Sequence, residues 1–178
     1  GNQIISCTVN KNENGDVSNG FLFKRDLTAQ QEILSTTPNV IKNCIIKDFS
    51  HRRIAIENYM NSFHLIGNSI FHTIESSSST VEAIYFQYGS YPPNNPDIIE
   101  GNKIYNLQPK NVAGNSVTGI RLPGGFCVKT FNNFISLKGN EQSTVTGITF
   151  ASYGYYSILD IYYNTILIYG ISSSDCIS

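Results

Sequence analysis

Short stretches in which apolar residues alternate with variable ones recur along the chain. The stretches are Gly20-Phe21-Leu22-Phe23, Arg53-Ile54-Ala55-Ile56, Ala83-Ile84-Tyr85-Phe86, Gly119-Ile120-Arg121-Leu122 and Gly147-Ile148-Thr149-Phe150. This period of two residues is typical of β-strands that bury one face. No segment shows a convincing helical period, and the two candidate exceptions are residues 27–34, a turn or two of helix within a loop, and residues 51–60. We therefore predict an all-β protein.

A second pattern, Asn-x-Ile, marks a repeat. Its asparagines are Asn43, Asn68, Asn102, Asn133 and Asn164, which follow one another at intervals of 25 to 34 residues. One of the alternating stretches precedes each copy, and Cys7 takes the asparagine position of a sixth copy near the start of the chain. A unit of about 30 residues therefore holds at least two short strands, which leaves too little chain for repeated strand–helix–strand crossovers.

A repeat of this size buries its apolar face by coiling, so that each turn lays its strands beside those of the previous turn. Parallel connections are right-handed by a strong general preference. We predict a right-handed parallel β-helix of about five to six rungs. The helix forms a single domain over residues 1–178. Both ends look cut from something longer, so we expect the chain to be part of a longer solenoid.

The repeated asparagines have two physical explanations. Asn tolerates the left-handed backbone conformation that a bend between strands often requires. Stacked Asn amides can also form hydrogen bonds from rung to rung in a ladder. Glycosylation does not explain them, because the chain contains no Asn-x-Ser/Thr sequon, and amides are weak metal ligands. We assign the structural ladder to Asn43, Asn68, Asn102, Asn133 and Asn164.

The composition suits stacked β-structure. Charged residues make up 14% of the chain, against roughly 25% in ordinary domains. Stacked strands would place like charges about 4.8 Å apart, so a low charge content is favourable. The net charge of −1 gives no long-range attraction for nucleic acids or anionic membranes. No apolar run approaches the length of a membrane span.

The four cysteines, Cys7, Cys44, Cys127 and Cys176, lie far apart and form no Cys-x-x-Cys pair. Zinc sites and redox motifs are therefore poorly supported. We expect buried thiols that fill small apolar spaces, and we predict no cofactor and no metal site.

Two blocks carry a resemblance to a known protein group. One is residues 161–170, Ile-Tyr-Tyr-Asn-Thr-Ile-Leu-Ile-Tyr-Gly, followed by three serines at 172–174, and the other is Val-Thr-Gly-Ile at 117–120 and 145–148. From Val40 onward the chain resembles the large secreted β-helix repeat proteins of Bacteroidota and related bacteria, which belong to the pectate-lyase-like β-helix superfamily. Many of them leave the cell by the type IX system. The resemblance implies an extracellular or cell-surface setting but no activity, because the group mixes adhesins with polysaccharide-acting enzymes.

Counting back from each asparagine assigns side chains to the two faces of one predicted sheet. The residues three positions before, expected to point inward, are Val40, Leu65, Ile99, Thr130 and Ile161. The outward column four positions before reads Asn39, His64, Ile98, Lys129 and Asp160. The outward column two positions before reads Ile41, Ile66, Glu100, Phe131 and Tyr162.

These columns place Lys129 beside Asp160 and Phe131 beside Tyr162 on neighbouring rungs. One interpretation is a glycan groove, in which aromatic rings contact sugar rings while charged groups bind hydroxyls or carboxylates. The simpler interpretation is an exposed ion pair, worth about 0–1 kcal/mol, next to an ordinary cross-strand aromatic pair.

Catalysis is a weaker interpretation of the same face. Lys129 would act as a general base with His64 or Asp160 as its partner, as proton-abstracting polysaccharide lyases require. Glu100 and Asp160 lie two rungs apart in different columns, about 10 Å or more, which is marginal even for an inverting glycosidase. No cluster of acidic residues suggests the Ca²⁺ site of pectate-lyase-like enzymes.

We therefore expect a non-catalytic extracellular or cell-surface β-helix with a structural or adhesive role and with glycans as candidate ligands. The alternative is a carbohydrate-active enzyme, a polysaccharide lyase before a glycoside hydrolase. Open strand edges at the ends of a β-helix also favour end-to-end self-association.

Overall fold

The computed structural model describes residues 1–10, 19–24, 37–57, 62–87, 95–124, 127–140, 142–151 and 158–170. Within these ranges the chain forms seventeen β-strands and no helix, which confirms the predicted all-β class. The short helix considered at residues 27–34 lies outside the described residues, as does Cys176. The helix considered at residues 51–60 is wrong for the described part, because Arg52–Glu57 form a strand.

The strands form three parallel sheets, named A, B and C here. Sheet A contains β1 (Gln3–Ile5), β4 (Asn39–Lys42), β7 (Phe63–Ile66), β10 (Asp97–Glu100), β13 (Cys127–Phe131) and β16 (Ile158–Tyr162). Sheet B contains β2 (Thr8–Asn10), β5 (Ile45–Lys47), β8 (Ser69–Phe71), β11 (Lys103–Tyr105), β14 (Phe134–Gly139) and β17 (Thr165–Gly170). Sheet C contains β3 (Asn19–Lys24), β6 (Arg52–Glu57), β9 (Thr80–Phe86), β12 (Ser116–Leu122) and β15 (Thr144–Phe150).

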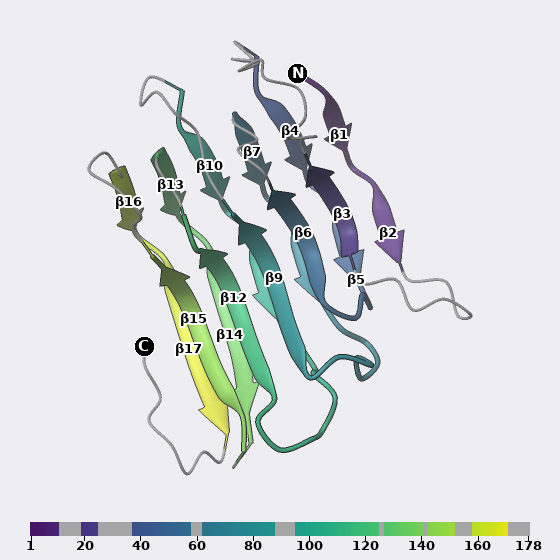
Figure 1. The fold of residues 1–178 in the computed structure, drawn as a ribbon. Coiled ribbons are helices and arrows are strands. Elements are labelled where there is room, and N and C mark those ends of the chain that lie inside the picture. Colours follow the sequence, from purple (N-terminus) through teal and green to yellow (C-terminus); the bar gives the residue numbers. More distant parts are fainter. Residues whose placement is uncertain are drawn as a thin grey trace.

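The first five rungs each consist of one strand from each sheet in the order A, B, C, and the last described rung consists of β16 and β17. Equivalent strands on neighbouring rungs pair in parallel. The coil advances from the N-terminal rung at the right of Figure 1 to the C-terminal rung at the left. Sheets A and B each contain six strands. The chain is therefore a parallel β-helix of about six rungs, as the repeat predicts.

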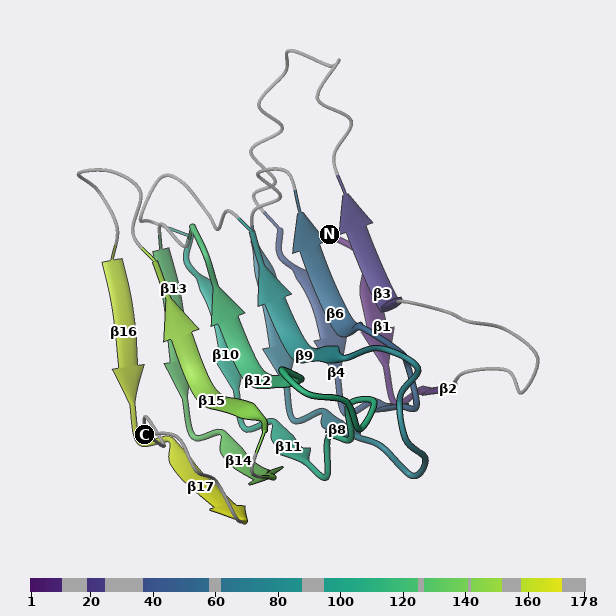
Figure 2. The same ribbon diagram turned by 60° about the horizontal axis from the view of Figure 1, so that its bottom comes forward.

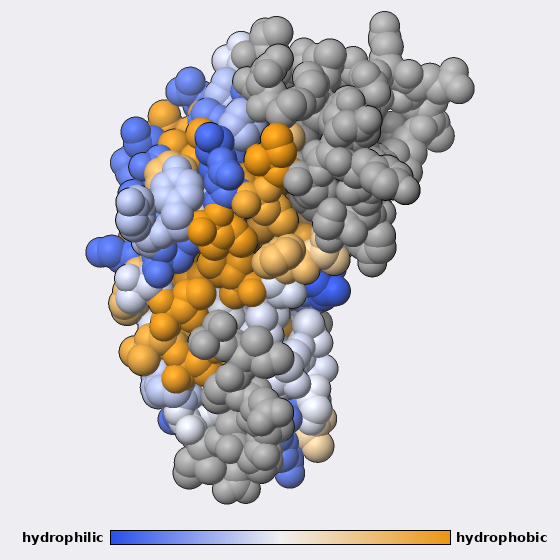
Figure 3. All heavy atoms as spheres, turned by 90° about the vertical axis from the view of Figure 1, so that its left-hand side faces the viewer, coloured by the Kyte–Doolittle hydropathy of each residue, from blue (hydrophilic) through white to orange (hydrophobic). Residues whose placement is uncertain are grey.

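The core consists of apolar columns that run along the coil. Ile46, Ile70, Ile104 and Ile135 form one column of fully buried side chains on sheet B. Ile54, Ile84 and Ile120 form the column that sheet C contributes to the same core. The end of the coil at β15 to β17 leaves part of this core open, and Figure 3 shows a band of apolar side chains there. Ile161, which continues the inward column of sheet A next to the buried Thr130, is 39% exposed.

The bend between sheets A and B uses two adjacent residues for two different tasks. The first residue has a positive φ on every rung, and these residues are Ser6, Asn43, Gly67, Gly101, Asn132 and Tyr163. The second residue points its side chain into the bend, and these residues are Cys7, Cys44, Asn68, Asn102, Asn133 and Asn164. The left-handed conformation therefore does not explain the repeated asparagines of the ladder, because the residue before them adopts it.

Hydrogen bonding does explain them. Asn102 accepts at Oδ1 from the backbone N–H and the side-chain Nδ2 of Asn68, at 3.0 Å each. Its own Nδ2 donates to the backbone carbonyl of Leu65 at 2.9 Å and to Oδ1 of Asn133 at 3.0 Å. The same pattern joins Asn133 to Asn164. The side chain thus satisfies backbone groups that the bend would otherwise leave buried without partners.

Asn43 is the exception, and its predicted place in the ladder is wrong. Its φ of 55° places it in the left-handed column, and Cys44 donates its backbone N–H to Asn68 Oδ1 instead. Asn43 and Cys44 are neighbours at this bend. Asn adopts the left-handed conformation more readily than most residues, so Asn43 takes the first position and Cys44 takes the ladder position. The predicted inward column consequently shifts by one residue on this rung, because Ile41 and not Val40 pairs with Leu65. The assignment of Cys7 to the ladder column is confirmed, since it lies opposite Cys44.

Two basic side chains lie inside the core. His72 is 1% exposed, Nε2 lies 3.0 Å from the carbonyl of Phe49, and the N–H of Gln108 donates to Nδ1 at 2.7 Å. Because Nδ1 accepts, the ring proton is assigned to Nε2 and the ring is neutral. Burial and the charge of Arg53 lower the His72 pKa to about 3, against an opposing effect from Asp48.

The Arg53 guanidinium is fully buried and has no hydrogen-bond partner among the described residues. Burial lowers its pKa to about 9, and the carboxylate of Asp48 opposes the shift. The equivalent positions on the neighbouring rungs are Ala83 and Gly119, where a Cβ on Gly119 would approach the Gly147 carbonyl to 2.6 Å. Sheet C is thus tight at this column, and Arg53 is its one long side chain among the described rungs.

We predict that Asn102→Ala lowers the free energy of unfolding by about 2–4 kcal/mol, because it removes the acceptor of the Asn68 N–H and the donor to the Leu65 carbonyl inside the bend. Chemical denaturation followed by circular dichroism measures the change. Asn132→Gly is the matched control, since Asn132 is exposed and occupies the column in which Gly67 and Gly101 already stand. Equal losses in the two variants would contradict the assigned role of the ladder.

His72 predicts a loss of stability in acid. Its folded pKa of about 3 lies below the ordinary 6.5, so the unfolded chain takes up a proton first as the pH falls. The contribution is complete above about pH 6.5 and declines between pH 6.5 and 3 by about 1.4 kcal/mol per pH unit. Unfolding free energies measured across this range should decline less steeply in His72→Gln. The same slope in the variant and in the natural chain would contradict the prediction.

Candidate functional site

The outer face of sheet A carries the columns that the sequence predicts over its last four rungs. His64, Ile98, Lys129 and Asp160 are paired in register, and so are Ile66, Glu100, Phe131 and Tyr162. On the β4 rung the one-residue shift replaces the predicted Asn39 and Ile41 by Val40 and Lys42. Ile41 is a core residue, 1% exposed.

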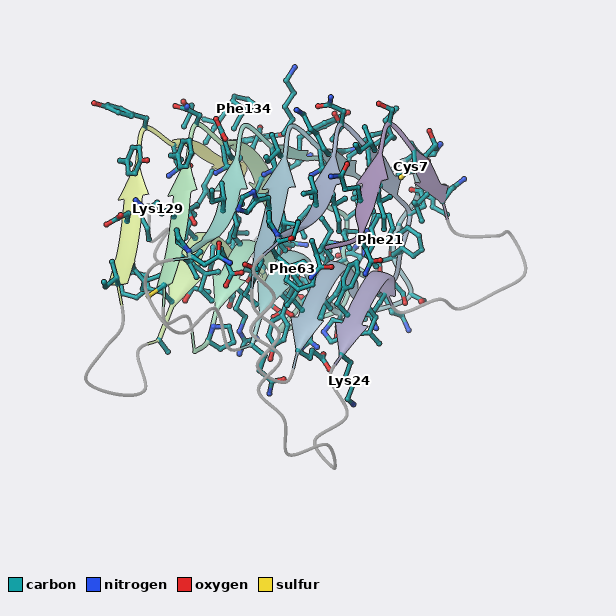
Figure 4. The ribbon with its side chains drawn as sticks, turned by 90° about the horizontal axis from the view of Figure 1, so that it is seen from above. Cys7, Phe21, Lys24, Phe63, Lys129 and Phe134 are labelled. Atoms are coloured by element: carbon teal, nitrogen blue, oxygen red, sulfur yellow. The ribbon has the colours of Figure 1, made fainter. Side chains whose placement is uncertain are left out.

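Lys129 and Asp160 form an ion pair across β13 and β16. Nζ lies 3.4 Å from Oδ2, and both side chains are 43% exposed. Lys129 lies toward the C-terminal end of the coil, far from Cys7 at the other end (Figure 4). Water screens a pair of this exposure, so it contributes little to folding and leaves both charged groups accessible to a ligand.

Phe131 and Tyr162 stack on one another beside this ion pair. Their ring centroids are 5.0 Å apart and their planes differ by 1°. Each ring therefore covers one face of the other. The ring edges and the two outer ring faces remain for contacts with other groups. Tyr163 meets Tyr162 edge to face at 5.4 Å and is 83% exposed. We name the group formed by Lys129, Asp160, Phe131, Tyr162 and Tyr163 the aromatic–ion face.

Tyr163 belongs to the aromatic–ion face but does not stand in either of the outward columns that the sequence predicts. It occupies the left-handed bend column, where the other rungs have Ser, Asn or Gly. A bulky residue at a left-handed position is uncommon and directs attention to the side chain. Its place directly before Asn164 in the repeat is the signal that identifies it.

His64 and Glu100 do not join the aromatic–ion face as close partners. Ile98 separates His64 from Lys129 in the column, so the two side chains stand two rungs, about 10 Å, apart. Burial lowers the pKa of His64, and Glu100 opposes the shift. Glu100 pairs in register with Phe131, one rung from it. The structure thus brings together Lys129 with Asp160, and Phe131 with Tyr162, but it does not bring a second titratable group next to Lys129 from the His64 side.

A second polar cluster lies on the outer face of sheet C, and the sequence prediction did not include it. Glu82 is 1% exposed, accepts from Arg52 Nε at 2.8 Å through Oε2, and accepts from Arg121 Nη1 at 2.6 Å through Oε1. The hydrogen bond to Glu82 raises the pKa of Arg121. His51 Nε2 lies 4.0 Å from the same carboxylate, and burial followed by the charge of Arg52 lowers its pKa.

Arg52 ties this cluster to the rest of sheet C. Its Nη1 donates to Glu57 Oε1 at 2.7 Å, and its guanidinium lies 3.6 Å from the centroid of the Tyr85 ring. Two arginines therefore neutralise Glu82, and the aromatic ring adds a cation–π contact. The sequence contains enough information to predict this cluster, because the alternating stretches align these rungs correctly. Extending each stretch by one residue toward the N-terminus places Arg52 beside Glu82.

A pocket of about 480 Å³ lies on the connections from sheet B to sheet C. Figure 2 shows the backbone of these connections along one edge of the coil. It is lined by Glu75, Asn106, Leu107, Gln108, Pro109, Asn111, Asn115, Lys138, Gly139, Asn140 and Ser143. Its amides already bond to one another: Asn140 Nδ2 donates to Asn111 Oδ1 and Gln108 Nε2 donates to Asn106 Oδ1. The first bond joins neighbouring rungs and the second lies within one connection, so the lining has a structural use whether or not a ligand enters.

Two absences hold for the part of the chain that the structure describes. No three His, Cys, Asp or Glu side chains gather there closely enough to hold a metal ion. No helix in these ranges is long and apolar enough to cross a membrane.

The two ion clusters should differ sharply when one carboxylate is neutralised. Glu82→Gln leaves two arginines around a buried neutral amide, so we expect a loss of about 3–5 kcal/mol in the free energy of unfolding. Asp160→Asn, in the exposed pair, should change it by less than about 1 kcal/mol. Denaturant titration of both variants in the same buffer measures the difference, and similar losses would contradict the contrast in burial.

Comparison of the chain with protein-family models, with curated proteins and with solved structures gives no match in any of the three. The resemblance to the secreted β-helix proteins of Bacteroidota therefore stays a prediction from the sequence, and the coiled architecture rests on the structure itself.

Proposed function

We propose that this chain is a non-catalytic β-helix of the cell surface or extracellular space, with a structural or adhesive role, and that the aromatic–ion face binds glycans. The observation that carries the proposal is the stack of the partly exposed Phe131 on the exposed Tyr162, directly beside the Lys129–Asp160 pair. Ring edges and outer faces next to accessible charges suit a ligand with both apolar C–H surfaces and hydroxyl groups.

The shape of a β-helix supports an extended ligand. Equivalent residues repeat along each flat sheet at about 4.8 Å, so one face can contact several units of a polymer at once. Tyr163, 83% exposed, stands at the edge of the aromatic–ion face and extends the aromatic surface. Many weak contacts along such a surface give adhesion without a deep pocket.

The geometry favours binding over the lyase alternative. A proton-abstracting base works with a partner within hydrogen-bond reach of the substrate. Lys129 contacts Asp160, which holds its ammonium group in a charged pair, and His64 stands two rungs away. A binding surface uses the same pair without further chemistry.

Glycan binding is tested with an array of neutral and acidic polysaccharides, followed by affinity measurement on the best ligand. We expect Tyr162→Ala to weaken binding about tenfold or more, because the variant removes one ring of the stack and the contact with Tyr163. The concentration is kept where sedimentation shows a single species, since end-to-end pairing through the open end of the coil would add avidity.

The chain offers matched controls. Phe71 and Tyr105 stack at 4.9 Å and 14° on the outer face of sheet B, so Tyr105→Ala removes an equivalent ring away from the ion pair. Asn140→Ala changes the pocket lining instead. Full affinity in Tyr162→Ala together with a loss in Asn140→Ala would move the site to the pocket. Unsaturated products released from acidic polysaccharides, and absent with Lys129→Ala, would replace the binding proposal with a lyase.

A further inference from the structure

Two cysteines occupy equivalent ladder positions on the first two rungs. Cys7 and Cys44 directly precede Thr8 and Ile45, which are partners in the pairing of β2 with β5. Neighbouring parallel strands lie about 4.8 Å apart, and a disulfide joins Cα atoms separated by about 4.4–6.8 Å. The backbone of the two rungs is therefore compatible with a bond between these residues.

The sulfur atoms are already in contact. Cys7 Sγ lies 2.8 Å from Cys44 Sγ, and both residues are in the thiol form. Non-bonded carbon atoms pack best at about 3.5–4.0 Å, and bonded sulfurs lie about 2.05 Å apart. No rearrangement of the coil is needed to bring the two sulfurs together.

In the thiol form, the Cys44 side chain makes the same kind of hydrogen bonds as the Asn side chains of the ladder. Its Sγ accepts the backbone N–H of Cys7 at 3.4 Å, as Asn102 Oδ1 accepts that of Asn68. Its S–H lies 3.4 Å from the carbonyl of Lys42 and 3.7 Å from that of Ile4. A thiol is a weaker hydrogen-bond former than an amide. The first two rungs therefore have the weakest part of the ladder.

We propose that Cys7 and Cys44 form a disulfide bond that joins the first two rungs of the coil in an oxidising compartment. A covalent bond at this place substitutes for the amide hydrogen bonds that hold the later rungs together. Disulfides persist in extracellular proteins, so the bond agrees with the proposed setting. It concerns a different part of the molecule from the aromatic–ion face, and neither proposal depends on the other.

Thiol–disulfide exchange with a low-molecular-weight disulfide, such as glutathione disulfide, forms the bond. The Cys7 thiolate attacks one sulfur of the reagent, releases one thiolate and leaves a mixed disulfide on Cys7. The Cys44 thiolate then attacks the Cys7 sulfur and releases the second. The protein loses two electrons, which reduce the reagent disulfide to two thiols, and the two cysteine protons pass to the leaving thiolates. Cys7 reacts first because it is partly exposed, whereas Cys44 is 1% exposed.

The experiment follows thiol oxidation in the purified chain. The reduced protein is incubated with glutathione and glutathione disulfide in a chelator-containing buffer, quenched with acid, alkylated and weighed by mass spectrometry. The incubation is run at alkaline pH, because burial and the hydrogen bond with Cys44 raise the pKa of Cys7 to about 11 and leave little thiolate at neutral pH. We expect two of the four cysteines to escape alkylation, and peptide mapping to show the bond between Cys7 and Cys44.

A thermal melt gives the second readout. The loop closed between Cys7 and Cys44 is long, so oxidation should raise the midpoint by about 5–15 °C over the reduced protein. The double variant Cys7→Asn/Cys44→Asn is the matched control, because it extends the amide ladder and contains neither thiol. It should fold and show no difference between oxidising and reducing buffer. Cys127→Ser should behave as the natural chain does, since Cys127 pairs in register with Ile158 and not with a cysteine.

Three results would overturn the proposal. The first is complete alkylation of Cys7 and Cys44 after oxidation of a folded sample. The second is a bond that links either residue to Cys127 or Cys176 instead. The third is an oxidised protein that melts at the same temperature as the reduced one.

Discussion

The bend between sheets A and B buries backbone groups that no strand can satisfy, and the rest of the coil depends on how they are bonded. A chain that turns sharply at the same place on every rung leaves an N–H and a carbonyl inside the bend each time. The amide of Asn102 donates and accepts at once, so it bonds to the backbone of Leu65 and to Asn68 and Asn133 on the rungs either side. Because the same residue type recurs, each satisfied bend fixes the position of the next.

That constraint sets the register of the outer faces. Once Asn133 and Asn164 are stacked, the residues before them must stand opposite one another as well, and Lys129 meets Asp160 while Phe131 meets Tyr162. The aromatic–ion face is thus a consequence of ladder register and not of a loop that folds over the sheet. Its members need no long-range arrangement beyond the repeat itself, which suits a surface used for extended contact.

The two clusters of charge have opposite physical characters. Glu82 is buried, and both of its carboxylate oxygens accept hydrogen bonds from Arg52 and Arg121. It therefore stiffens sheet C and is not accessible to a ligand. Lys129 and Asp160 remain open to water and available for a ligand. Arg53, buried without a hydrogen bond among the described residues, stands apart from both and places a guanidinium inside the core at β6.

The sequence by itself determined the all-β class, the coiled repeat and the register of the last four rungs, because each follows from local periodicity and from a residue type that recurs at the bend. It did not determine the first rungs, where Asn43 and Cys44 occupy two neighbouring positions of the bend. The left-handed backbone of Asn43 and the burial of Ile41 together place Cys44 in the ladder there. Nor did it determine that Glu82 would be buried between two arginines, or that the sulfurs of Cys7 and Cys44 would touch. Those contacts depend on the depth and distance of side chains from different rungs, and such quantities exist only after the coil has closed on itself.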